Sequence, residues 1–134
     1  MANHDALMKV QMIASRAMQA YEKRMEVGMG NMANAQSVGY VPKGVSFQAT
    51  VDRATGVEVV KANRPQAQPN RVRQQYDPQH PLANADGYVS MPVVDPLVQM
   101  MDVTQAKQDM ERAMKVYENA TDLQYKTIKL ISGN

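Results

Sequence analysis

Apolar side chains recur every three to four residues over the last third of the chain, from Pro96 to Ile131. This spacing predicts one long helix, because it places the apolar side chains on a single face. Asp95 is a favourable N-cap and Pro96 fits a first helical turn. At coiled-coil spacing, the seam of this helix comprises Val103, Ala106, Met110, Ala113, Tyr117, Ala120 and Gln124. The residues expected to widen the seam into a broader face are Met100, Met114, Thr121 and Ile128.

A second periodic stretch, from about residue 4 to residue 35, predicts another long helix. Its stripe is less regular, because Gln11 interrupts it and because Gly28 and Gly30 each cost roughly 1 kcal/mol of helix stability relative to Ala. A kink or a frayed end is therefore expected near Gly28. The side chains predicted to pack are Leu7, Ala14, Met18, Tyr21 and Met25. Since no other segment is of similar length, each terminal helix is the natural partner for the seam of the other.

The middle of the chain holds all seven prolines, which lie between Pro42 and Pro96. Runs of β-branched residues, separated by turn residues, predict short strands there. These predicted strands are 45–52, 57–61, 71–76 and 88–94. The first two would form a hairpin closed by a turn that ends in Gly56, and Pro92 would confine the last strand to an edge. Residues 65–69 predict a polar loop, and residues 77–87 predict a long turn.

These elements predict an α+β fold. Two long terminal helices form a coiled-coil-like layer, and a small antiparallel β insert lies between them in the sequence. The expected divisions are residues 1–39 for the first helix and the motif that follows it, 40–95 for a β-hairpin module with proline-rich loops, and 96–134 for the last helix. A chain of 134 residues is one domain by default. Neither a membrane-spanning run nor a signal-peptide core is evident, so export without a cleaved signal is the expected route if the protein leaves the cytoplasm.

Composition narrows the possible functions. The chain has 12 Met, one Phe, no Trp and no Cys, and its net charge is +2 with both signs dispersed. Methionine is adaptable and suits a surface that must fit several neighbours. The dispersed charge predicts no nucleic-acid patch and no basic membrane helix. The lack of cysteine excludes disulfides and thiol chemistry.

Candidate chemistry is sparse. Asp77, His80, Asn84 and Asp86 fall in one loop and could surround a metal ion, but Asx residues beside prolines more often stabilise turns. A lone His without Cys is a poor zinc set. Neither a nucleophile motif nor a pair of carboxylates in a predicted cleft is present. The sequence therefore predicts a protein that is not an enzyme and that has no cofactor, metal or small-molecule substrate.

The end of the first predicted helix resembles the N-I/L-A-N-A-x-T-P-G-Y signature of bacterial flagellar rod, hook and filament-axis proteins, the axial family. The matching residues are Asn31, Ala33, Asn34, Ala35, Gly39 and Tyr40. Val38 stands where that signature usually has Pro.

Residues 76–89 are similar to the Y-D-P-x-H-P-x-A-x-x-x-G-Y-V stretch of the proximal rod proteins within this family, the FlgC type. The matching residues are Tyr76, Asp77, Pro78, His80, Pro81, Gly87, Tyr88 and Val89. The segments 91–94 and 126–130 are also similar to that type, although Val93 replaces an Asn. In the last helix the A-x-R-x-Y-x-A-N run of the family is only partly kept, with Gln108, Met110, Arg112 and Ala113 at the altered positions.

The resemblance implies a structural subunit of the basal-body rod, the drive shaft that crosses the periplasm and transmits torque. It also implies export by the flagellar type III apparatus and contacts with other copies, other rod proteins and the basal-body rings. Two alternatives remain. One is a neighbouring rod or hook-junction protein, and the other is a stand-alone adaptor that binds a single partner helix in a groove. The β insert argues against the adaptor, because it would have no evident role there.

Overall fold

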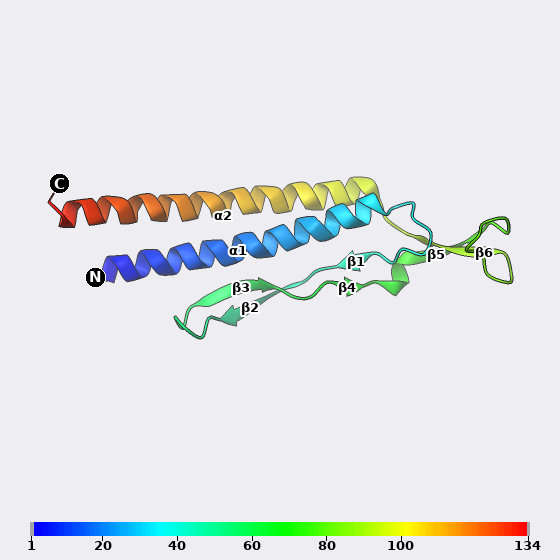
Figure 1. Ribbon diagram of the computed structural model, residues 1–134, viewed down its shortest axis with the longest axis horizontal. Coiled ribbons are helices and arrows are strands. Elements are labelled where there is room, and N and C mark those ends of the chain that lie inside the picture. The colour runs from blue at the N-terminus through cyan, green and yellow to red at the C-terminus, as the bar shows by residue number, and fades with distance from the viewer. Residues whose placement is uncertain (1, 134) are drawn as a thin grey trace.

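Two long helices lie side by side and antiparallel, with an extended β ribbon beside them (Figure 1). The computed structural model describes residues 2–133. Helix α1 spans Ala2–Ala33 and helix α2 spans Pro96–Ile131. Short antiparallel strand pairs occupy the chain between them, so the predicted α+β class is confirmed. The first predicted segment begins at Met1 and the last one finishes at Asn134. Both of these residues lie outside the described residues.

The ends of α2 follow from local chemistry. The Asp95 carboxylate accepts a hydrogen bond from the Leu97 backbone N–H at 3.0 Å, so the predicted N-cap is confirmed. Gly133 has a φ of +74° just beyond the helix, a conformation that glycine adopts without a steric penalty. Within residues 2–133, neither helix combines the length and apolarity needed to cross a membrane.

The helix pair is packed along a narrow stripe. Ala106 and Ala120 of α2 are 0% and 3% exposed, and Ala14 of α1 is also buried. The other expected seam residues are partly buried, namely Leu7, Met18, Tyr21, Met25, Val103, Met110, Ala113 and Gln124. Tyr117 is more exposed than the rest of the seam. Within the single chain α1 covers only one stripe, so Met100, Met114, Thr121 and Ile128 are exposed, and the packing of these residues in a broader face stays a prediction.

Helix α1 continues through Gly28 and Gly30 without a break, so the expected kink or frayed end is wrong. Gly28 is buried at the contact with α2, where an added Cβ would lie 2.6 Å from Val103 Cγ2. Gln11, which interrupts the apolar stripe, instead donates hydrogen bonds across the helix pair to Thr121 Oγ1 at 2.9 Å and Gln124 Oε1 at 3.2 Å. Both irregularities in the pattern are therefore contact points between the helices.

The first hairpin packs on the side of α1 that faces away from α2 (Figure 1). Strand β2, Phe47–Val51, pairs with β3, Glu58–Ala62, in the predicted antiparallel arrangement, although β2 starts two residues later than expected. Buried Val59 and Ala20 lie at this interface, and the rings of Phe47 and Tyr21 meet edge-on at 5.8 Å. Helix α1 is thus covered on two sides.

The ribbon extends through a second, shorter pairing. Strand β1, Lys43–Gly44, pairs with β4, Gln66–Ala67, and a single 3-10 turn, η1, follows at Pro69–Arg71. The prediction of a plain loop at 65–69 is therefore wrong. Because β1 and β4 contain only two residues each, they show no alternating pattern that could have marked them.

A second hairpin projects beyond the helix pair, at the end of the molecule opposite the start of α1 and the end of α2 (Figure 1). It consists of β5, Val72–Tyr76, and β6, Tyr88–Pro92, in antiparallel register from Val72 opposite Pro92 to Tyr76 opposite Tyr88. Both predicted strands are confirmed. Among the described residues β6 pairs with β5 alone, which leaves Pro92 on an edge strand.

Candidate assembly surfaces

A buried asparagine fastens the end of α1 to the ribbon. Asn31 is 3% exposed. Its Nδ2 donates to the Lys43 carbonyl at 2.8 Å, and its Oδ1 accepts from the Lys43 N–H at 3.0 Å and from the Tyr40 hydroxyl at 2.8 Å. Burial raises the pKa of Tyr40 above its ordinary value. One side chain therefore satisfies three polar groups at the corner between α1 and β1.

The neighbouring motif residues complete this corner. The Gly30 carbonyl accepts twice from Asn34, from its side-chain Nδ2 at 2.9 Å and from its backbone N–H at 3.1 Å. Gly39 has a φ of +84°, and its N–H donates to the Ser90 carbonyl of β6 at 2.8 Å. Ala33 is exposed and Ala35 is partly buried. The residues that resemble the axial signature thus join α1, β1 and β6 at one place.

The loop 77–87, here called the tip loop, is stabilised by its own polar side chains. Asn84 Oδ1 accepts from the Asp86 and Tyr88 N–H groups at 3.0 and 2.9 Å, and His80 Nδ1 accepts from the Leu82 N–H at 3.0 Å. Gly87 has a φ of +83°. These hydrogen bonds stabilise the conformation of the tip loop. Within residues 2–133, no group of three His, Asp or Glu side chains is placed to hold a metal ion.

Tightly packed side chains surround the base of the tip loop. An added Cβ on Gly87 would lie 2.9 Å from Tyr76 Cε2 and 3.1 Å from Pro78 Cβ. The Tyr76 and Tyr88 rings meet edge-on at 5.3 Å, and Val89 is buried. Pro81 is exposed on the loop. The sequence pattern thus identified the residues that give this loop its shape.

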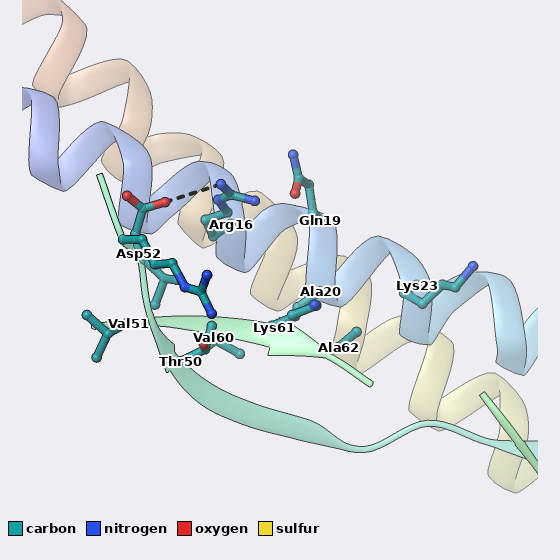
Figure 2. Close-up of a pocket in the computed structure, with 12 residues that line it drawn as sticks. Arg16, Gln19, Ala20, Lys23, Thr50, Val51, Asp52, Val60, Lys61 and Ala62 are labelled. Carbon is teal, nitrogen blue, oxygen red and sulfur yellow. Dashed lines mark hydrogen bonds and ion pairs between the residues drawn. The ribbon is translucent and has the colours of Figure 1, made fainter. Parts of the chain in front are cut away.

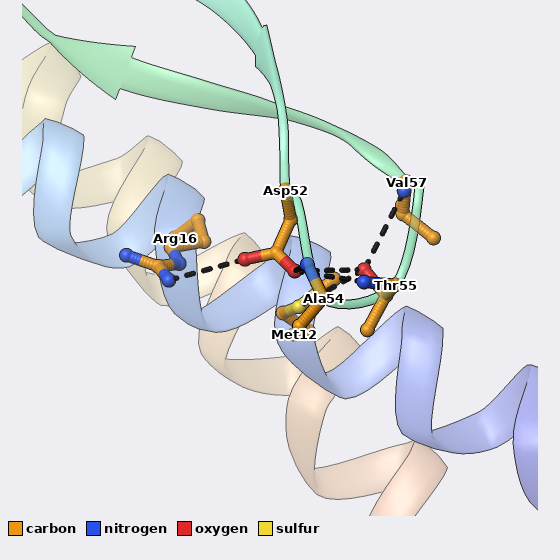
Figure 3. A network of polar contacts seen from close by, with 6 residues as sticks. All are labelled: Met12, Arg16, Asp52, Ala54, Thr55 and Val57. Carbon is orange, nitrogen blue, oxygen red and sulfur yellow. Dashed lines mark hydrogen bonds and ion pairs between the residues drawn. The ribbon is translucent and has the colours of Figure 1, made fainter.

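The turn of the first hairpin is held against α1 by a network that the sequence did not predict (Figure 3). Asp52 Oδ1 accepts from the Thr55 hydroxyl at 3.0 Å and from the Ala54 and Thr55 N–H groups at 3.1 Å each. The other carboxylate oxygen, Oδ2, accepts from Arg16 at 3.4 Å. The Thr55 hydroxyl bond, helped by the backbone bonds and Arg16, holds the pKa of Asp52 below its ordinary value. The spacing of Asp52 and Thr55 was a signal for the turn, but nothing in the sequence indicated Arg16.

A groove lies between α1 and the first hairpin and is called here the basic groove (Figure 2). It encloses about 440 Å³. Its floor includes Ala20 and Val59, and its charged lining residues are Arg16, Lys23, Arg53, Lys61 and Asp52. Four cations therefore surround a single carboxylate.

Many apolar side chains of α2 stay exposed, and they lie at several positions around the helix. These exposed apolar side chains, together called here the outer face of α2, include Leu97, Met100, Met101, Met114, Tyr125, Ile128, Leu130 and Ile131. Large exposed apolar areas on soluble proteins are typical of surfaces that contact partners. The seam alanines are not part of the outer face, because Ala106 and Ala120 already pack inside the chain.

Comparison with known proteins connects these surfaces to a family. The chain is 36% identical over 134 residues to the flagellar basal-body rod protein FlgC of Salmonella typhimurium, covering 93% of this chain and 98% of that protein. The chain belongs to the FlgC family of flagellar basal-body rod proteins. It is also 30% identical to FlgC of Agrobacterium fabrum, over 97% of this chain and 99% of that protein, and 35% identical to FlgC of Escherichia coli O157:H7, over 93% and 98%. No protein-family model matches the chain.

Membership of the FlgC family confirms the resemblance found in the two motif segments. The family similarity covers nearly the whole chain, including both helices and both hairpins. The family relationship therefore applies to the whole fold and not only to the corner at Asn31 or the tip loop.

Proposed function

We propose that this chain is a structural subunit of the flagellar basal-body rod. In this role it polymerises with further copies and with other rod proteins into the shaft that crosses the periplasm and transmits torque. The role requires no catalytic step. Similarity to FlgC proteins over almost the full length of both chains supports the proposal.

The single observation in the structure that carries this proposal is the outer face of α2. Its exposed apolar side chains lie in two groups, one between Leu97 and Met101 at the start of the helix and one between Met114 and Ile131 in its second half. A 36-residue helix is about 54 Å long at 1.5 Å per residue, far more than one small ligand could cover. Neighbouring helices of the same kind would cover it, as in an assembly whose contacts repeat without closing.

The same proposal extends to partners and route. Rod proteins next to this subunit, and the rings around the rod, are the partners it requires. Export through the flagellar type III apparatus without a cleaved signal peptide would deliver the chain to the growing rod.

Complementation in a motile bacterium tests the proposal. Deletion of the gene should abolish swimming and the rod, and a plasmid copy should restore both. Purified basal bodies should contain the chain, as measured by mass spectrometry, and electron microscopy of a tagged copy should place it in the rod. Complete rods in the deletion strain would contradict the proposed role.

A further inference from the structure

We propose that the tip loop of one copy seats in the basic groove of a second copy. This inference rests on the proposed function, since it describes one of the contacts by which rod subunits would join. It assigns a partner to the groove, and it gives the tip loop a binding role in addition to its shape.

The groove offers both cations and apolar surface to a partner. Among the described residues, Arg53 and Lys61 have no ion-pair partner, whereas Arg16 is paired with Asp52 and Lys23 with Glu26. The side chain of Val51, at the edge of the groove, is 58% exposed, and Val60 beside it is exposed as well. A ligand that brings carboxylates together with one or two apolar side chains would satisfy this lining.

The tip loop presents that combination. Asp77 and Asp86 have no ion-pair partner among the described residues, and Leu82 is 66% exposed at the surface of the loop. The bonds of Asn84 and His80 hold the loop in one shape before it meets a partner. The two unpaired carboxylates and the exposed leucine of the tip loop thus match the two unpaired cations and the two exposed valines of the basic groove. Because the loop is already held in one conformation, little conformational entropy is lost when it docks.

The positions of the two surfaces favour contact between different copies. The tip loop projects beyond one end of the helix pair, whereas the groove lies beneath α1, toward the opposite end (Figure 1). One chain therefore cannot fill its own groove in this conformation. A contact between two different patches leaves a free loop and a free groove at the ends of the complex, so it continues as an open series wherever its rotation does not close into a ring.

Cross-linking in purified basal bodies tests the contact directly. The chain has no cysteine, so Leu82→Cys and Val60→Cys introduce the only thiols. A short bifunctional maleimide should join positions 82 and 60 of different copies when both substitutions are present, giving a ladder of dimers and larger products. The control pair, Leu82→Cys with Val116→Cys, carries an equally accessible thiol on α2 and should give none.

The result separates the two proposals. Chain that is found in basal bodies but shows no more 82-to-60 linkage than the control pair overturns the loop-in-groove contact and leaves the rod role intact. Linkage from position 60 to a different protein overturns the assignment of a second copy. Absence of the chain from basal bodies overturns both proposals.

A charge exchange provides a second measurement. Asp86→Lys and Lys61→Glu should each lower the number of complete rods about tenfold, since each places like charges together. The double variant should restore most of the lost rods. Two single defects that simply combine in the double variant, without any recovery, would count against pairing of these two positions.

Discussion

Two glycines of α1 lie two residues apart yet meet different surroundings. At Gly28 an added Cβ would approach Val103 Cγ2 to 2.6 Å, whereas at Gly30 the nearest atom, the Tyr40 hydroxyl oxygen, would be 3.9 Å away. Val103 is β-branched and sits in a helix, so its side chain has little freedom to move aside. The first glycine is therefore required by the close approach of the helices, and the second is not.

This contrast predicts opposite effects of two alanine substitutions. Gly30→Ala should raise the free energy of unfolding by up to about 1 kcal/mol through helix propensity. Gly28→Ala gains the same propensity but overpacks the contact at a cost of about 1–3 kcal/mol, so it should destabilise. Urea unfolding followed by circular dichroism measures both, and Val103→Ala should rescue Gly28→Ala. Equal stabilisation by both substitutions would show that the helices do not pack this closely.

Asn31 acts through the groups that it satisfies. Asn31→Ala removes the partners of the Lys43 N–H, the Lys43 carbonyl and the Tyr40 hydroxyl. Leaving such groups unpaired should lower the free energy of unfolding by about 2–3 kcal/mol. Tyr40→Phe removes only one of these bonds and should cost about 1 kcal/mol. The same urea experiment compares the two, and a cost for Asn31→Ala no larger than that of Tyr40→Phe would argue against the corner described above.

At the scale of elements, the hairpin turn depends on an ionised carboxylate. Asp52 organises residues 54 and 55 and reaches Arg16 on α1, so one group both closes the turn and attaches it to the helix (Figure 3). Its pKa is lower in the folded chain than its ordinary value. Its contribution to stability is therefore present at neutral pH and is lost as the pH falls through the folded-state pKa.

Nuclear magnetic resonance titration of the Asp52 carboxyl group tests this. The midpoint should lie below about 3.9, the ordinary value for Asp. Thr55→Val removes the hydroxyl bond, which is the largest cause of the shift, and should raise the midpoint toward that value. Arg16→Gln should raise it less, because the Coulombic effect of Arg16 is the smallest of the causes. A midpoint at or above the ordinary value would mean that the network is not formed in solution.

How far each element could be predicted depends on its length and pattern. The long helices followed from periodicity, since a pattern repeated over many turns outweighs single exceptions such as Gly28, and the N-cap at Asp95 followed from its residue type. Strands β1 and β4 are too short to carry a pattern and depend on their pairing. The tip loop was recognised from its prolines and Asx residues, but the basic groove was not. Its cations come from α1 and from the distant hairpin, and only the tertiary fold brings these together.

At the scale of the whole molecule, α1 covers only part of the surface of α2. The seam that the sequence indicated is buried against α1 of the same chain, with Ala106 and Ala120 at its centre. Of the residues expected to widen that seam, Met100, Met114 and Ile128 belong to the outer face, whereas Thr121 accepts a hydrogen bond from Gln11 of α1. The single chain thus buries one stripe of α2, and the apolar side chains of the outer face stay exposed.

Substitutions in the buried stripe and on the outer face should therefore fail at different steps. Ala120→Leu forces three extra carbon atoms into a filled contact between the helices and should cost about 1–3 kcal/mol of unfolding free energy in the isolated chain.

Met114→Glu combined with Ile128→Glu places charge on the outer face, where both side chains are already exposed, and should leave the unfolding curve nearly unchanged. In an assembly that buries this face, however, each unpaired carboxylate must lose its hydration, at a large cost. The double variant should thus be stable and exported but absent from purified basal bodies, and the cells should not swim. Met8→Glu, on an exposed part of α1, serves as a matched change of charge for the unfolding measurement. Normal swimming by cells with the double outer-face variant would show that this face stays exposed to water in the rod, and would remove the main structural support for the proposed assembly.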